Sequence, residues 1–71
     1  MVKVKLNSKA VRQVLARKNK SQNWLAKRLE ISSGFMAQLL AGERCPSPNV
    51  RERIQAAFND LRFEDLFTIK A

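Results

Sequence analysis

The spacing of hydrophobic residues changes along the chain, and these changes divide it into short elements. Residues 1–6, MVKVKL, alternate apolar and basic side chains, a period of two that is typical of a short edge strand protected by lysines. A disordered arm fits the same residues. From Asn7 or Ser8, either of which is a good N-cap, the period becomes helical until about Asn19. We therefore expect a first helix of about ten residues.

Two further helices are predicted in the middle of the chain. Ser21 is an N-cap candidate, and leucine and alanine then recur at helical spacing up to about Leu29. Ser32 caps the next helix, SGFMAQLLA over residues 33–41, and Gly42 stands where a left-handed C-cap is expected. The sequence thus predicts two short helices joined by a turn of about three or four residues.

The last third of the chain carries the signals of one full helix and a terminal turn. After a loop, Ser47-Pro48 is a strong helix start, because a capping hydroxyl precedes a proline at the first helical position. Residues 62–67 can form a fifth helical turn, and residues 68–71 can form a strand beside residues 2–6. The positions that predict the buried stripe of the fourth helix are Val50, Ile54, Ala57, Phe58 and Leu61.

Length and residue types exclude several classes of function. The 71 residues contain no repeat, linker or low-complexity segment, so we expect one domain over residues 1–71, small enough that partners often help to stabilise it. No apolar run is long enough for a membrane span or a signal peptide, which favours a cytoplasmic protein. With no histidine and one cysteine, Cys45, we expect no metal site, no cofactor and no histidine-dependent catalysis. The carboxylates show no acid/base spacing, so we expect no enzyme activity.

Positive charge is concentrated in the first part of the chain. The net charge is +8, from 14 Lys and Arg against 6 Asp and Glu, and no acidic residue precedes Glu30. Such an imbalance attracts polyanions, of which nucleic acid is the commonest. An anionic membrane surface is the rival partner, and it is disfavoured because the apolar residues follow several short, capped helices. A solvated helix surface is the third interpretation.

The residues of the two middle helices narrow the choice. Helix, turn and helix of these lengths match the DNA-binding arrangement whose second helix lies in the major groove. An ordered set of residues accompanies it: Ser21-Gln22, Leu25-Ala26, Leu29, Ile31-Ser32, Met36, Gly42 and Pro46-Ser47, then the helix with Ile54 and Ala57. From residue 6 to residue 67 the chain resembles the Cro/repressor-type (lambda-repressor-like, Xre) helix-turn-helix family. The resemblance implies an all-α bundle of about five short helices that binds operator DNA, usually as a homodimer.

Two residues depart from the family pattern. Glu30 stands where the family usually has glycine in the turn. Either this glutamate accepts a left-handed backbone, at a cost on the order of 1 kcal/mol, or the turn has another shape. Leu40 stands where a glutamate is common, which suggests an altered core edge or interface.

The third helix presents two different faces when its residues are placed at about 100° each. Its apolar arc contains Phe35, Met36, Leu39 and Leu40, so the other arc is left for DNA. Gln38 is the long hydrogen-bonding side chain of that arc and can offer a bidentate amide to adenine; a solvated surface amide is the alternative. The residues expected to read bases are Ser33, Gly34, Phe35, Ala37 and Gln38. Phe35 lies at the border, where it packs on a thymine methyl or covers the core edge.

Phosphate contacts are expected from groups that flank this helix, because such contacts fix its register on the duplex. The resemblance assigns backbone contacts to Gln22 and Arg44. Asn23, Lys27 and Arg51 are further candidates, with a solvated side chain as the alternative for each.

Four apolar residues of the tail, Phe63, Leu66, Phe67 and Ile69, are more than a monomer surface normally exposes. We expect them to make dimer contacts unless they belong to the core. The sequence as a whole therefore predicts a small bacterial or phage transcription regulator, acting as an operator-binding repressor. A DNA-binding antitoxin or a restriction-modification controller shares that fold, and a protein-interaction module without DNA binding is the alternative from another class.

Overall fold

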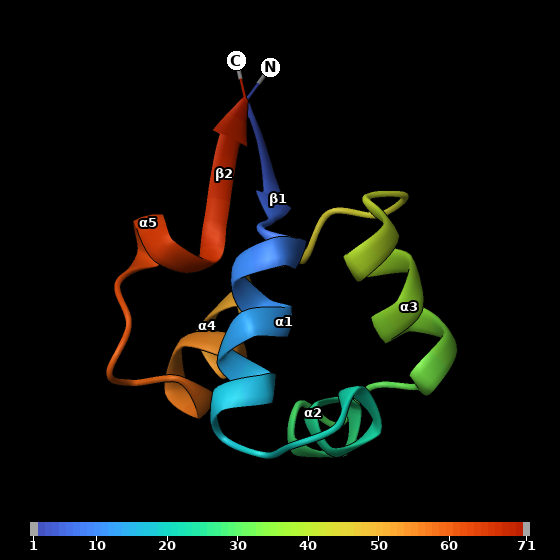
Figure 1. Ribbon diagram of the computed structural model, residues 1–71. Coiled ribbons are helices and arrows are strands. Elements are labelled where there is room, and N and C mark those ends of the chain that lie inside the picture. Colours follow the sequence, from blue (N-terminus) through green and yellow to red (C-terminus); the bar gives the residue numbers. More distant parts are fainter. Residues whose placement is uncertain (1, 71) are drawn as a thin grey trace.

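The computed structural model describes residues 2–70 and contains five helices and one two-stranded sheet (Figure 1). Met1 and Ala71, which were assigned to the terminal strands, lie outside the described residues. None of the helices within residues 2–70 is long and apolar enough to cross a membrane. In chain order the elements are β1 (Lys3–Leu6), α1 (Ser8–Arg17), α2 (Gln22–Arg28), α3 (Ser33–Ala41), α4 (Pro48–Ala57), α5 (Phe63–Leu66) and β2 (Phe67–Lys70).

Each of the four longer helices is preceded by an N-cap residue whose side chain accepts a hydrogen bond from a backbone amide of the first turn. These caps are Asn7, Ser21, Ser32 and Ser47, with acceptor distances of 3.0 to 3.3 Å. Such caps satisfy amides that the helix itself leaves unpaired. The predicted starts of the first four helices are therefore confirmed.

Helices α1, α2 and α3 all end in the same motif. A residue one or two positions beyond each helix has a left-handed backbone: φ is 57° at Asn19, 59° at Glu30 and 79° at Gly42. In each case this residue's amide bonds to the carbonyl three positions back, and the next amide bonds five positions back, which is the Schellman arrangement. The left-handed C-cap at Gly42 is confirmed, and Glu30 takes the same conformation without being glycine.

The sheet joins the two ends of the described chain. β1 and β2 are antiparallel, with Leu6 opposite Phe67 and Lys3 opposite Lys70, so the proposed pairing of the terminal segments is confirmed. Figure 1 shows the strands projecting from the helical body at the end opposite α2, with α1 in the middle and α3 to one side. The sheet thus fixes where α1 begins relative to the C-terminal tail.

The core is apolar throughout and draws on every element. Among the described residues 2–70, no polar or charged residue is buried. Of the stripe predicted for the fourth helix, Val50, Ile54 and Phe58 are buried, whereas Ala57 and Leu61 are half-buried at the core edge, because α4 ends at Ala57. Besides Pro46, the buried residues are Leu6, Val11, Val14, Leu15, Leu25, Ala26, Leu29, Met36, Leu39, Leu40, Val50, Ile54, Phe58, Leu66 and Phe67.

The tail residues expected at a dimer surface divide into two groups. Leu66 and Phe67 are 0% and 3% exposed, so their side chains belong to the core, which was the stated alternative to dimer contacts. They fill the core because α5 packs on α1 and β2 pairs with β1. Phe63 is half-buried, with its ring centroid 4.8 Å from that of Phe67, and Ile69 alone of the four is exposed, at 58%.

Candidate nucleic-acid interface

Helices α2 and α3 are joined by a short turn that backbone hydrogen bonds hold in place. The amide of Glu30 bonds to the carbonyl of Lys27 at 3.1 Å, and the amide of Ile31 bonds to that of Ala26 at 3.0 Å. Ser32 then caps α3 through the amide of Phe35. These bonds leave the turn little freedom, and they set the direction in which α3 departs from α2.

A residue from α4 reinforces this turn. Arg53 Nη1 donates to the Leu29 carbonyl at 3.0 Å and lies 3.9 Å from the Glu30 carboxylate. The guanidinium therefore binds the C-terminal carbonyl end of α2, where the helix dipole favours a cation. Sequence reasoning missed Arg53, because its partners lie more than twenty positions away (24 for Leu29) and no local signal marks them.

The other end of α3 is held by the N-terminal segment. The Ser8 hydroxyl donates to the Leu40 carbonyl, and Lys5 Nζ lies 3.4 Å from the Gly42 carbonyl. The last carbonyls of a helix have no partner within it, so these two side chains satisfy them from α1 and β1. With Arg53 at its entrance, α3 is positioned at both ends by other elements.

The two arcs of α3 are distributed as the periodicity predicts. Met36, Leu39 and Leu40 are buried. On the opposite arc Ser33, Gly34, Ala37 and Ala41 are exposed, and Gln38 is half-buried. Phe35 is half-buried and packs against the core, so it covers the core edge. A methyl group added at Gly34 would meet no atom within 4 Å, and its backbone is not left-handed, so the fold itself does not require glycine there.

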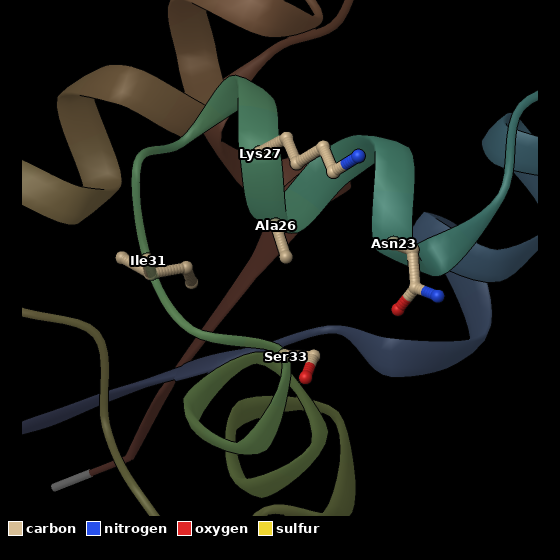
Figure 2. Close-up of a pocket in the computed structure, with 5 residues that line it drawn as sticks. All are labelled: Asn23, Ala26, Lys27, Ile31 and Ser33. Atoms are coloured by element: carbon tan, nitrogen blue, oxygen red, sulfur yellow. The ribbon is translucent and has the colours of Figure 1, made fainter.

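A hollow of about 320 Å³ separates α2 from the start of α3. It is lined by Asn23, Ala26, Lys27, Ile31 and Ser33, and Figure 2 shows the Asn23 amide and the Ser33 hydroxyl extending into the space between the two elements. Three residues that were predicted for two different roles, Asn23 and Lys27 for phosphate and Ser33 for bases, thus lie around one hollow. All three carry hydrogen-bond donors.

The remaining predicted phosphate contacts are spread around this unit. Gln22 is half-buried in the first position of α2, and Arg44 is exposed in the loop after α3. Arg51 is half-buried on α4. Trp24, also on α2, is half-buried, and Lys20 Nζ lies 5.2 Å from its ring centroid. Gln22, Arg44 and Arg51 are not among the residues that line the hollow.

Charge favours an anionic partner for the N-terminal part of the chain, which contains β1, α1 and α2. The first 29 residues carry nine cations and no acid, and none of these cations is buried. Two of the six carboxylates lie close to cations: Glu30 to Arg53, and Asp60 to Lys18 at 3.6 Å. Within residues 2–70 no group of three His, Cys, Asp or Glu side chains is placed to hold a metal ion.

Comparison of the chain with protein-family models, with curated proteins and with solved structures gave no match.

Proposed function

We propose that the protein binds double-stranded DNA sequence-specifically, with α3 in the major groove, and that it regulates transcription by occupying an operator. The observation that carries the proposal is the exposed arc of α3 together with the donor-lined hollow beside it. An α-helix fits within the width of the major groove, and it can approach the bases closely when the side chains on its outer face are small. Ser33, Gly34, Ala37 and Ala41 make such a face.

Gln38 is the base reader of this proposal. It is the long amide side chain on the arc of small residues, and its amide matches the N6 and N7 edge of adenine, a contact worth about 1–3 kcal/mol of discrimination. The open space at Gly34 supports close approach of the helix to the groove floor or to a phosphate. Ser33 and Ala37 lie beside these positions and contribute contacts of shorter reach.

The hollow between α2 and α3 is the proposed binding site of a phosphate of the DNA backbone. Asn23, Lys27 and Ser33, which all carry a hydrogen-bond donor, line it, and α3 begins at the same point, where the helix dipole favours an anion. Gln22 and Arg44 add contacts on the two sides of this site, and Arg51 adds one from α4. Because phosphate contacts carry no sequence information, they set the register in which Gln38 reads.

We infer further that the helices are arranged as in the Cro/repressor-type family and that the operator is bound by two copies of the chain. The mostly helical fold, the α2–turn–α3 unit and the left-handed residue at position 30 support this inference. A DNA-binding antitoxin or a restriction-modification controller would use the same surface. A protein-interaction module, the alternative from another class, would show no salt-dependent affinity for duplex DNA.

The proposal is tested by measuring duplex affinity against salt concentration. Each phosphate contact that a cation makes contributes about one counterion, with a slope of roughly −0.9 for log K against log salt. We expect affinity to fall steeply with salt, and Lys27→Ala to lower the slope by about one. Lys18→Ala is the matched control, because Lys18 lies beside Asp60, and it leaves the slope unchanged. The absence of duplex binding at low salt would refute the proposal.

A further inference from the structure

The outer edge of β2 carries backbone groups that the sheet does not use. Asn7 donates its amide to the Leu66 carbonyl at 2.8 Å, which sets the alternation of the antiparallel ladder. Thr68 then bonds with Lys5, while the amides and carbonyls of Phe67 and Ile69 point away from β1. The Phe67 amide donates instead to the Phe63 carbonyl in α5. The Phe67 carbonyl and both backbone groups of Ile69 therefore face outward along this edge.

An apolar groove follows the same edge. It has a volume of about 420 Å³ and is lined by Phe63, Glu64, Phe67, Thr68 and Ile69. Ile69 is 58% exposed, and the rings of Phe63 and Phe67 lie tilted by 35° with centroids 4.8 Å apart. In Figure 1, α5 lies beside the start of β2 only, and the strand projects past it. An exposed strand edge with an apolar groove is a template for another strand.

We propose that this edge binds β2 of a second copy of the chain, antiparallel and around a two-fold axis, so that the two sheets join into one of four strands. Charge argues for a second copy as the occupant. Glu64 and Asp65 lie just before β2, and Lys70 lies at its end. Antiparallel pairing brings each basic end beside the acidic start of the partner strand, which is the self-complementarity that a two-fold interface requires.

The placement of the other charges agrees with this geometry. Three of the six acids, Asp60, Glu64 and Asp65, lie in the tail, whereas the chain as a whole has a net charge of +8 that repels a second copy elsewhere. The inference does not depend on DNA binding. A pairing of four residues is smaller than a standard protein interface of about 1,600 Å², so we expect a weak dimer in free solution.

Sedimentation equilibrium of the full chain without DNA, at protein concentrations up to roughly 1 mM, tests the pairing, because a weak dimer is populated only at such concentrations. Wild type is expected to dimerise. Ile69→Asp removes the apolar contact in both copies and raises the dimer Kd roughly 100-fold. Val2→Asp is the control, because Val2 is 64% exposed but precedes β1, away from the free edge, and we expect it to leave the dimer unchanged. Circular dichroism melts check that both variants fold.

A charge exchange separates this antiparallel pairing from other modes of self-association. Glu64→Lys and Lys70→Glu are each expected to weaken the dimer about fivefold, because each replaces two attractions by repulsions at exposed sites. The double variant restores the wild-type Kd. A wild-type monomer at every concentration, a dimer unaffected by Ile69→Asp, or a double variant no tighter than either single one would overturn the proposal, whatever the protein does with DNA.

Discussion

The two arcs of α3 belong to one nine-residue helix, yet different constraints act on them. On the inner arc, Met36 and Leu39 are fully buried and pack against the rest of the core. On the outer arc, Ser33, Gly34 and Ala37 touch solvent and contribute little to the fold. The inner arc is explained by what it contacts within the molecule, whereas for the outer arc we propose a DNA partner.

This difference makes the two arcs separable by mutation. A change on the inner arc acts on the free energy of unfolding and affects DNA binding only through it. If the proposed function is correct, a change on the outer arc acts on DNA binding and leaves the free energy of unfolding nearly as it was.

The largest effect is expected at Met36. Met36→Ala removes a side chain that is 0% exposed, and it lowers the free energy of unfolding by about 2–5 kcal/mol through lost burial and a residual cavity. Urea denaturation measures the change, with Gln38→Ala as the control that loses less than about 0.5 kcal/mol. Equal losses in the two variants would contradict the division into arcs.

Gln38→Ala is expected to have the next largest effect, on specificity. It lowers the preference for the bound base at one operator position by about 1–3 kcal/mol and leaves affinity for random duplexes nearly intact. Competition binding with single-base operator variants measures it. A uniform loss over all sequences would show that Gln38 does not read a base.

Gly34→Ala has the smallest expected effect, with opposite signs in the two assays. The added methyl group meets no atom of the chain, so the variant is as stable as wild type or more stable, by at most about 1 kcal/mol. Operator affinity falls if the helix approaches the groove as closely as proposed. Thermal melts and duplex titrations measure the two effects, and unchanged affinity would contradict the close approach.

Much of the fold follows from the sequence because its signals are local. Ser32, Gly42 and Ser47-Pro48 mark helix ends through hydrogen bonds to residues a few positions away, and the apolar spacing places α3 correctly. The backbone conformation of Glu30 could not be predicted, because the resemblance does not say whether a glutamate at the glycine position keeps the left-handed backbone or changes the turn. Its φ of 59° shows that the Schellman bonds outweigh the strain.

The features that could not be predicted depend on contacts between distant residues. Arg53 is one surface cation among many until α4 packs beside the turn and places it on the Leu29 carbonyl. The burial of Leu66 and Phe67 likewise depends on where α5 meets α1. The hollow that joins Asn23, Lys27 and Ser33 forms only when α2 and α3 take their relative positions, so periodicity predicted its members separately but not together.

Selection of bound duplexes from a random library is the sharpest test of sequence-specific reading by α3. We expect an enriched consensus that contains an adenine position dependent on Gln38. For a protein that binds as two copies, the consensus has two-fold symmetry with half-sites about 10 base pairs apart. A pool that remains random after selection, although the protein is folded, would contradict sequence-specific reading by α3.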